Sequence, residues 1–191
     1  MKIYEPPEFE FYAYTFKDEK GHNGAVTSRR GLCAITFGQK KLSVTKKLLK
    51  ELMTGRTGKI KWVKELKDID DEDAKYILGC FHSELDEYFH GKLKRFTLPI
   101  EIGCGSEFDR KVWMGLESIP YGETVSYKKL ANMIGEPSAA RAVGNSCGNN
   151  PLPIIIPCHR VLESKKKIGG FSIGVAKKRM LLKLEGFDTR N

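Results

Sequence analysis

The chain has 191 residues, of which 40% are apolar and 30% are charged, and its 33 Lys and Arg against 24 Asp and Glu give a net charge of +9. This length allows one large domain or two small ones, and the composition excludes a low-complexity chain. The sequence lacks a membrane-length apolar run, and the N-terminus, MKIYEPPEFEFYAY, lacks the apolar stretch of a signal peptide. We therefore expect a soluble, unexported protein in the cytoplasm, or in the nucleus if its source is eukaryotic. The positive charge favours a polyanionic partner, although solvated surface lysines would also produce it.

The cysteine content argues against a disulfide framework. There are five cysteines, an odd number, and no pair has the CxxC spacing of a zinc ribbon. Free thiols of this kind are typical of a reducing compartment. Zinc-ligating residue types occur in the first half without a spacing that favours a site, namely Cys33, Cys80, His22 and His82. A structural zinc site built from these residues stays open, and the sequence otherwise predicts no metal ligands and no cofactor.

The first half of the chain predicts a small α/β domain over residues 1–95. β-branched and aromatic residues with glycine punctuation indicate four strands, near Glu8–Phe16, Ala25–Arg29, Leu32–Phe37 and Lys59–Leu66. Two helices are expected, at Leu42–Met53 and Asp71–Phe89. In the second helix apolar residues recur on one face, which indicates a core-facing side made of Ala74, Ile77, Leu78, Phe81, Leu85 and Phe89. This half shows no residue spacing that chemistry would require.

Residues 96–105 have the composition of a connector, and residues 106–191 predict a mostly helical domain. Helices are expected from Ser106 to Ile119, from Ser126 to Gly135, over SAARAVGNSCG, and from about Val175 to Glu185. The first two begin at a serine that can cap them, and glycines end the second and the last. The second and third helices are short and are joined by Gly-Glu-Pro, which is the outline of a helix-turn-helix.

The stretch NNPLPIIIPCHRV combines a buried segment with reactive residue types. Ile154–Ile156 have the pattern of a short buried strand, and the prolines on both sides suit the edge of a sheet. A cysteine beside an apolar strand is usually an inert, small hydrophobic residue. However, a proline directs the chain out of the core before Cys158, and His159 and Arg160 supply a base and positive charge that lower a thiol pKa. We therefore expect Cys158 to be an ionised nucleophile at the mouth of a cleft.

Two further residues fit a role beside this cysteine. A histidine that takes a thiol proton is normally oriented by a carboxylate, and Glu185 in MLLKLEG is a candidate. The helix dipole disfavours an acid at a helix C-terminus, so Glu185 either has another use or is simply exposed there. Asn150 precedes a proline and is biased toward an extended or turn conformation. Its amide either holds the active-site turn or closes a loop.

The small-residue helix suggests a close approach to another surface. Ala139, Ala140 and Gly144 leave its backbone bare around Arg141. An arginine on such a face can replace a base displaced from a duplex, and the alternative is a plain helix–helix contact with a solvated Arg141. Tyr127, on the preceding helix, either packs in the core or directs its hydroxyl at a base or phosphate.

Five segments occur in the order and spacing of one known family. IPYGETVSYKKLA, AARAVG, NPLPIIIPCHRV, GGFS and LLKLEG together resemble the O6-alkylguanine-DNA alkyltransferases, also called methylated-DNA–protein-cysteine methyltransferases. The match covers about Ser106 to Gly186, and PCHRV with its flanks is highly specific. The resemblance implies a ribonuclease-H-like N-terminal α/β domain and a C-terminal helical domain with a winged-helix-like helix-turn-helix. It also implies DNA repair by direct reversal, as a monomer acting on double-stranded DNA.

The resemblance assigns the chemical roles. Cys158 is similar to the residue that accepts the alkyl group from a flipped-out O6-alkylguanine, with O4-alkylthymine as a second substrate. His159, through a water, and Glu185 resemble the relay that removes the thiol proton, and Asn150 resembles the residue that supports the turn. Because an S-alkyl cysteine has no comparable leaving group, we expect one irreversible transfer per molecule.

The resemblance also assigns the DNA-binding roles. Tyr127 is similar to the residue that crowds the 3′ phosphate and donates a proton toward the guanine ring, and Arg141 to the finger that fills the vacated stack. Ala139, Ala140 and Gly144 belong to a helix that enters the minor groove in this family. A base pocket is implied at Val161, Arg160 and Phe171, with backbone groups of Cys158, Val161 and Ser172 reading the guanine.

The sequence departs from the family at the pocket loop. Phe171 stands where tyrosine is usual, and Ile173 where a second glycine is common, which leaves the accepted alkyl size open. Lys165–Lys167 replace a short polar turn, either as a phosphate contact or as a solvated loop. Two other function classes remain alternatives: a Cys-His-Glu hydrolase or protease, and a lesion-binding module without chemistry. The first gives no reason for the Arg141 helix, and the second gives none for Cys158.

Overall fold

The computed structural model describes residues 11–18, 20–54, 58–164 and 167–187. Contacts within the chain divide it into two compact units. The first comprises Met1–Asp86 with Thr97–Cys104, and the second comprises Glu87–Phe96 with Gly105–Asn191. The division differs from the expected boundary at residue 95, because Glu87–Phe96 packs with the second unit. None of the helices in the described part of the chain has the length and hydrophobicity of a membrane span.

The first unit contains a four-stranded sheet in the order β3-β2-β1-β4. Its strands are β1 (Phe11–Asp18), β2 (Gly21–Thr27), β3 (Leu32–Gln39) and β4 (Ile60–Val63). Neighbours β1, β2 and β3 are antiparallel, and β4 runs parallel to β1. The four expected strands are therefore present. The start expected at Glu8 lies outside the described residues, and β2 begins four residues earlier than expected, because backbone groups of the Gly21–Gly24 segment pair with β1.

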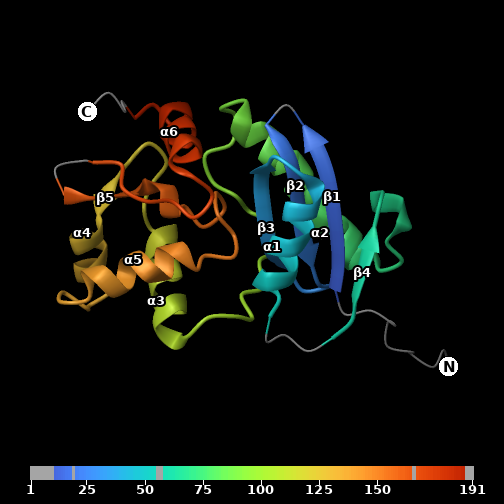
Figure 1. Ribbon diagram of the computed structural model, residues 1–191, viewed down its shortest axis with the longest axis horizontal. Helices are drawn as coiled ribbons and strands as arrows, with labels where there is room; N and C mark the ends of the chain where they lie inside the picture. Colours follow the sequence, from blue (N-terminus) through green and yellow to red (C-terminus); the bar gives the residue numbers. More distant parts are fainter. Residues whose placement is uncertain (1–10, 19, 55–57, 165–166, 188–191) are drawn as a thin grey trace. The chain divides into compact units, whose positions relative to one another are not determined.

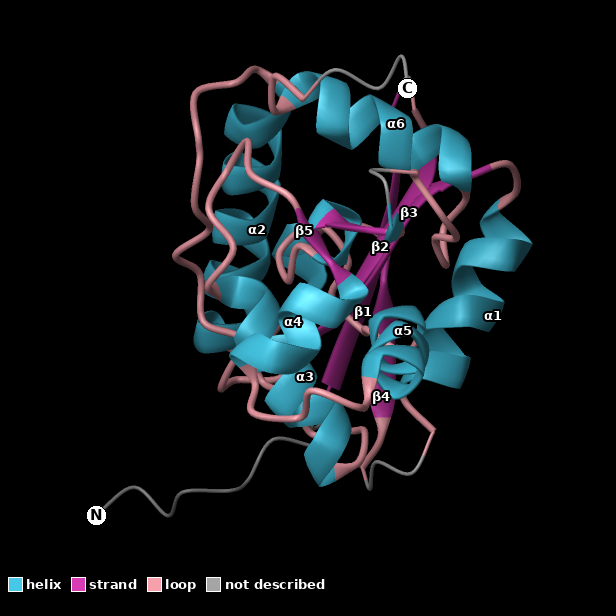
Figure 2. Ribbon diagram, turned by 90° about the vertical axis from the view of Figure 1, so that its left-hand side faces the viewer, coloured by secondary structure: helices cyan, strands magenta, loops and turns pink. Residues whose placement is uncertain are grey.

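Helices cover both faces of this sheet. α1 (Leu42–Leu52) lies against one face and α2 (Glu72–Phe89) against the other, as Figures 1 and 2 show from two directions. Successive side chains of β1 point to opposite faces of the sheet. Ala13 lies in the core under α1, and the Phe16 ring packs against Phe81 of α2. Gly24 permits the close approach of α1, because a Cβ there would lie 2.7 Å from a methyl of Leu49.

The second unit consists mainly of helices around a two-stranded parallel ladder. The helices are α3 (Glu107–Glu117), α4 (Tyr127–Met133), α5 (Ala140–Gly148) and α6 (Val175–Leu184), and the ladder is β5 (Val125–Ser126) with β6 (Val161–Leu162). The expected serine caps are present, because Ser106 accepts from the Asp109 N–H and Ser126 from the Lys129 N–H. The buried Trp113 indole donates to the carbonyl of Ser146 at 2.8 Å and so fixes α5 against α3.

The strand expected at Ile154–Ile156 is wrong. The segment is buried but forms a turn, in which the Ile156 N–H donates to the Leu152 carbonyl at 2.8 Å. Ile154 has φ of 83°, the left-handed region that branched residues avoid. The cause is local: Pro153 and Pro157 lack N–H groups, so the three isoleucines cannot sustain a ladder. The turn leads into a short 3₁₀ helix, η2 (Cys158–Arg160). Another 3₁₀ helix, η1 (Leu66–Asp68), lies in the first unit.

Candidate active site

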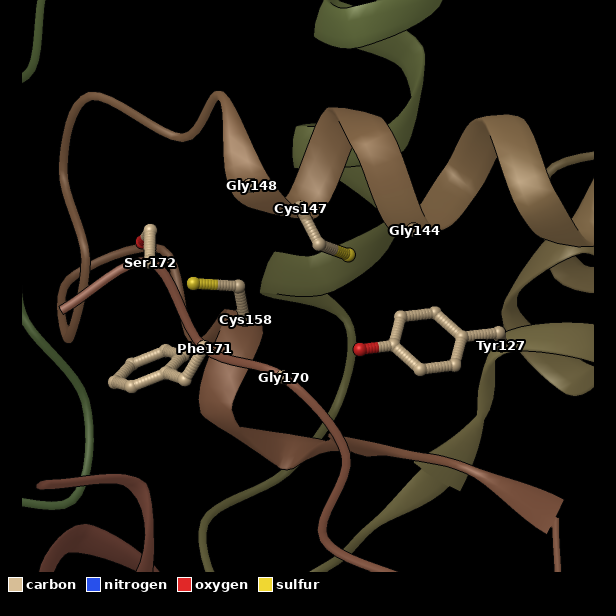
Figure 3. A pocket seen from close by; sticks show the side chains of 8 residues that line it. All are labelled: Tyr127, Gly144, Cys147, Gly148, Cys158, Gly170, Phe171 and Ser172. Atoms are coloured by element: carbon tan, nitrogen blue, oxygen red, sulfur yellow. The ribbon is translucent and has the colours of Figure 1, made fainter. Parts of the chain in front are cut away.

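Cys158 lies in the wall of a small cavity. It is the first residue of η2 and only 2% exposed, and the cavity in front of it has a volume of about 210 Å³. Figure 3 shows its sulfur among side chains from α4, α5 and the loop before α6. The residues that line the cavity are Tyr127, Gly144, Cys147, Gly148, Cys158, Gly170, Phe171 and Ser172. The thiol is therefore covered by protein except on the side of a cleft.

Asn150 holds the turn that presents this thiol. Its amide Nδ2 donates to the Ile156 carbonyl at 2.8 Å and contacts the Cys158 sulfur at 3.1 Å, and its Oδ1 accepts from the Leu152 N–H at 2.9 Å. The side chain is 4% exposed. Asn150 thus supplies the partners that the proline-flanked turn cannot obtain from a sheet, and it touches the sulfur itself.

His159 and Glu185 form a buried pair behind the cysteine. The imidazole is fully buried, and its Nε2 lies 2.9 Å from Glu185 Oε1. The other ring nitrogen, Nδ1, has no hydrogen-bond partner among the described protein atoms. The Phe171 ring packs edge-on against the imidazole at 6.5 Å between centroids. The pair has the composition and contact expected for a base with its orienting carboxylate.

Glu185 is the centre of a dense set of donors. Its Oε1 accepts from the Tyr88 hydroxyl at 2.7 Å and from Arg160 Nη2 at 2.9 Å, besides the imidazole. Its Oε2 accepts from Arg160 Nε at 2.9 Å and from the Gly122 N–H at 3.1 Å. Gly122 has φ of 78°, which favours glycine at this contact. The alternative of an exposed helix-end carboxylate is therefore wrong, since Glu185 is 5% exposed and fully partnered.

These contacts fix the protonation of the pair. Although burial alone would raise it, the hydrogen bonds from His159 and Arg160 lower the pKa of Glu185 to about 2. Burial lowers the pKa of His159, opposed by the hydrogen bond and charge of Glu185. At neutral pH the carboxylate is thus ionised and the imidazole neutral, so Nε2 carries the proton and Nδ1 is a free acceptor. This tautomer is the one that can take a proton from a thiol.

The expectation that Cys158 is ionised in the resting protein is wrong. Burial raises the pKa of its thiol to about 11, against smaller lowering effects from the Asn150 amide and the charge of Lys178. Arg160, which was expected to lower the pKa, instead points at Glu185 and donates from Nη1 to the Ile119 carbonyl at 2.7 Å. Arg160 therefore forms an ion pair with the Glu185 carboxylate and does not stabilise a thiolate. The Cys158 thiol must lose its proton to a base before it can act as a nucleophile.

Lys178 is a buried cation that sequence patterns did not reveal. Its side chain on α6 is 0% exposed, and its Nζ donates to the Val161 carbonyl at 2.6 Å and to the Gly170 carbonyl at 3.3 Å. Burial lowers the pKa of Lys178, opposed by the negative charge that Cys158 and Cys147 carry when they are ionised. The ammonium thus connects β6 to the pocket loop and places positive potential near the Cys158 sulfur.

Tyr127 and Arg141 occupy the outer side of the site. The Tyr127 hydroxyl points into the cavity of Cys158 from the side opposite Ser172 (Figure 3). Burial raises its pKa to about 12, so the phenol stays protonated. Arg141 is exposed on α5, without a hydrogen-bond or ion-pair partner among the residues that the structure describes. Along the same helix Gly144 lines the cavity, and Ala139 and Ala140 are half-buried.

A second cavity shares Tyr127 as a wall. It has a volume of about 470 Å³ and is lined by Ser126, Tyr127, Lys128, Ala140, Glu163, Ser164 and Lys167. Two lysines and two serines give it a basic, hydrogen-bonding character. Of the tract Lys165–Lys167, the first two residues lie outside the described ranges, and Lys167 belongs to this cavity.

The structure brings together most of the expected site. Cys158, Tyr127, Gly144, Phe171 and Ser172 share one cavity. Arg160 and Val161 are not among its described lining residues, since Arg160 turns to Glu185 and Val161 is buried in β6. Residues that the sequence patterns missed are Tyr88, Gly122, Cys147 and Lys178. A glycine in a turn and a lysine in the last helix are the only sequence signals for Gly122 and Lys178. No local pattern distinguishes Tyr88.

Positive charge is concentrated in the unit that holds this site. The second unit contains 17 Lys and Arg against 9 Asp and Glu, whereas the first contains 16 against 15. The net charges are therefore +8 and +1 of the total of +9. In the described part of the chain, no three or more His, Cys, Asp or Glu side chains gather into a group that could ligate a metal ion.

Two family models match consecutive parts of the chain. The ribonuclease-like domain of 6-O-methylguanine DNA methyltransferase matches residues 26–102, and the DNA-binding domain of 6-O-methylguanine DNA methyltransferase matches residues 107–187. Among similar curated proteins, the methylated-DNA–protein-cysteine methyltransferase of Mycolicibacterium paratuberculosis is 48% identical over 114 residues, covering 60% of this chain and 68% of that protein. The inducible one of Bacillus subtilis is 42% identical over 117 residues, covering 61% and 63%.

Solved structures resemble the chain over nearly its full length. The crystal structure of Mycobacterium tuberculosis OGT in complex with DNA aligns with a TM-score of 0.70 and 31% identity, covering 91% of this chain and 92% of that one. The crystal structure of Mycobacterium tuberculosis O6-methylguanine methyltransferase aligns with a TM-score of 0.71 and 28% identity, covering 95% and 96%. The sequence alignments with the curated relatives span about two thirds of those proteins, and the structural ones span over nine tenths.

Proposed function

Since the chain belongs to the 6-O-methylguanine DNA methyltransferase family, we propose that it repairs alkylated DNA by direct reversal, with Cys158 as the alkyl acceptor. Its relatives are methylated-DNA–protein-cysteine methyltransferases, and one similar structure is a complex with DNA. The observation that carries the proposal is the Cys158 thiol in a cleft with the His159–Glu185 pair behind it. The substrate is O6-alkylguanine in a duplex, with O4-alkylthymine as a second substrate.

The target base reaches the thiol by leaving the helix stack. The O6 atom lies inside a duplex, where the sulfur in a cavity wall cannot approach it in line. The bare face of α5 supports entry into the minor groove, where the exposed Arg141 fills the space of the extruded base. Because Tyr127 lines both cavities, the base occupies the one at Cys158 while a neighbouring phosphate lies beside Lys128 and Lys167.

The chemical step begins with removal of the thiol proton. That proton passes, through a bridging water, to Nδ1 of His159, and the imidazolium is stabilised by the ionised Glu185. The thiolate then forms a bond to the alkyl carbon while the bond from that carbon to O6 breaks. The departing guanine receives a proton from Tyr127, whose phenol is protonated at neutral pH. Solvent then takes the proton from the imidazolium and returns one to the Tyr127 phenolate, so that both side chains regain their starting protonation. The products are unmodified guanine and S-alkyl-Cys158.

The reaction is stoichiometric. A thioether carbon is not released by water as a thioester is, so the acceptor is consumed in one transfer. The protein acts as a monomer without a cofactor. All five of its cysteines are free thiols, which suits a reducing compartment such as the cytoplasm.

The test is to incubate the protein with duplex DNA that carries methyl-labelled O6-methylguanine and to map the label by mass spectrometry. We expect about one label per chain, on Cys158, and none in the Cys158→Ala variant, which still binds the duplex. Repeated turnover on esters or peptides would favour a hydrolase instead. Tight binding of the lesion without label would favour a module that only recognises damage.

A further inference from the structure

Tyr88 contacts Glu185 from α2, outside the five C-terminal sequence segments that carry the motif resemblance. It lies in the last turn of α2, within the range matched by the ribonuclease-like family model, yet it packs in the unit that contains Glu185. Its hydroxyl donates to Glu185 Oε1 at 2.7 Å, across 97 residues of sequence. That oxygen is the one that also accepts from His159 Nε2. The tyrosine and the catalytic imidazole thus share one carboxylate atom.

We propose that Tyr88 is a positioning residue of the alkyl-transfer site, whose hydroxyl fixes Glu185 Oε1 so that His159 presents an unprotonated Nδ1 to the thiol. The inference rests on the proposed function. It assigns to Tyr88 no contact with the substrate or with Cys158.

The surroundings of Tyr88 hold its hydroxyl in one place. The side chain is 0% exposed, and its ring packs against aromatic neighbours with centroids 5.3 to 6.1 Å away, namely Phe89, Phe96 and Tyr121. Burial and the negative charge of Glu185 raise the pKa of Tyr88, so it remains a donor. A rigid ring therefore supplies a fixed hydrogen bond to the carboxylate.

The hydroxyl also moderates the basicity of Glu185. Oε1 receives three donors, from Tyr88, His159 and Arg160, and each takes a share of its negative charge. Without the hydroxyl, the carboxylate interacts more strongly with the imidazole and favours the imidazolium. The charged and titratable groups around the pair are Arg160, Tyr121, Tyr88 and, on α6, Lys178, and Tyr121 and Lys178 do not bond to the carboxylate. Among these neighbouring tyrosine and lysine side chains, only Tyr88 therefore bonds to the carboxylate.

The chain offers a matched control for this hydroxyl. Tyr121 packs against the Tyr88 ring, and its hydroxyl donates to the Leu184 carbonyl at 3.0 Å rather than to Glu185. Tyr88→Phe and Tyr121→Phe therefore each remove one hydroxyl from the same aromatic cluster. Only the first changes the coordination of the carboxylate.

Two measurements on the full-length chain test the inference. The first is the rate of label transfer from O6-methylguanine duplex between about pH 5 and pH 9. For Tyr88→Phe we expect the acid limb to move to higher pH and the plateau rate to fall by roughly three- to thirtyfold, less than the hundredfold cost of a 1 Å misplacement. The second is the proton resonance of His159 Nε2–H in the free protein, which should move downfield. Tyr121→Phe should retain the wild-type acid limb and resonance, even if it lowers the melting temperature.

The inference is overturned if Tyr88→Phe keeps the wild-type acid limb and resonance, or if both variants shift equally. If Tyr88→Phe does not fold, 3-fluorotyrosine at position 88 keeps the ring and strengthens the donor, and the same readouts should move in the opposite direction. Failure of the wild-type chain to transfer label would refute the proposed function alone, since the resonance is measured without substrate.

Discussion

Cys158 illustrates how a residue's surroundings set its chemistry. With a thiol pKa of about 11, only roughly one molecule in ten thousand carries the thiolate at pH 7. The resting sulfur is therefore guarded against adventitious electrophiles, which matters for an acceptor that is used once. In the mechanism that we propose, the sulfur becomes nucleophilic only when the neutral His159 takes its proton. The adjacent histidine and arginine both bond to Glu185, but Arg160 uses three of its nitrogens on Glu185 and the Ile119 carbonyl, whereas His159 keeps Nδ1 without a partner among the described protein atoms.

Glu185 should make stability depend on acid. Its folded pKa of about 2 lies below the ordinary value of 4.5, so its stabilisation of roughly 3 kcal/mol is complete above about pH 5.5 and is lost as the pH falls through 4.5 toward 2. The buried His159, whose pKa is also lowered, adds a loss that begins below its ordinary 6.5. In Glu185→Gln we expect a loss of about 3 kcal/mol at pH 7 and a flatter pH dependence below pH 5, measured by urea unfolding.

The matched control for this prediction is Glu123→Gln, which removes an exposed carboxylate from the same unit. It should unfold like the wild type at pH 7. If Glu185→Gln had the wild-type stability at pH 7 and the wild-type pH dependence below pH 5, the buried carboxylate would not stabilise the fold through its hydrogen bonds.

Lys178→Met should slow transfer by removing the cation near the sulfur. Its ammonium favours the thiolate and holds the carbonyls of Val161 and Gly170. We expect the pKa of Cys158 to rise further, which the pH dependence of Cys158 alkylation measures. The transfer rate should fall by about tenfold or more, which label transfer measures.

Lys177→Met is the control, because Lys177 immediately precedes Lys178 in α6 and donates to the Ile173 carbonyl instead. An equal loss in both variants would indicate that α6 was destabilised and not that a charge was lost at the sulfur.

At the scale of elements, the turn before η2 and helix α5 place the reactive groups. The proline-flanked isoleucines form a turn instead of a strand, and Asn150 connects that turn to the sulfur. α5 begins with small residues and ends at the cavity, with Trp113 holding it from α3. Its exposed side presents Arg141, while Gly144 leaves room at the pocket. In the proposed function, one helix therefore serves both the duplex and the base.

Arg141→Ala should slow repair of duplex DNA in particular. If Arg141 fills the vacated stack, its loss leaves part of the unstacking cost of a few kcal/mol uncompensated, and transfer from duplex should slow by roughly ten- to a hundredfold. Transfer from the free O6-alkylguanine base, which needs no extrusion, should be much less affected. Arg110→Ala, an exposed arginine of α3, is the control for lost charge. Equal rates for both variants on duplex would remove Arg141 from the flipping role.

At the scale of the whole molecule, charge is distributed unevenly between the two units. The unit with the site carries +8 of the net +9, and its second cavity adds Lys128 and Lys167 beside Tyr127. A polyanion is therefore attracted to the unit that performs the chemistry. The nearly neutral first unit contributes little to that attraction.

Duplex binding should weaken steeply with salt. Each phosphate neutralised by a Lys or Arg releases counterions, so affinity falls with salt in proportion to the number of such contacts. For the Cys158→Ala variant we expect at least a roughly tenfold loss of duplex affinity between 50 and 200 mM salt, measured by fluorescence anisotropy. Lys128→Ala combined with Lys167→Ala should reduce the salt slope. An affinity that does not change with salt would contradict binding through the basic unit.

The sequence by itself determined the local features of this protein. Serine caps, helical periodicity and strand composition depend on residues near one another in the chain. They predicted the sheet strands of the first unit and the α-helices of both units to within a few residues, but not the short β5–β6 ladder or the 3₁₀ helices. The adjacency of Cys158 and His159 and the small-residue helix are likewise visible in the sequence alone. The turn at Ile154 escaped prediction, because an apolar run between two prolines has no periodicity that separates strand from turn.

Only the tertiary structure decided how these groups act. The protonation of Cys158, the target of Arg160 and the five donors of Glu185 depend on burial and on partners distant in sequence, such as Tyr88 and Gly122. Lys178 shows the same dependence, since an ordinary helix lysine becomes a buried cation only through the packing of β6 and the pocket loop. Desolvation and hydrogen bonding are properties of a position in space, and a linear pattern does not contain them.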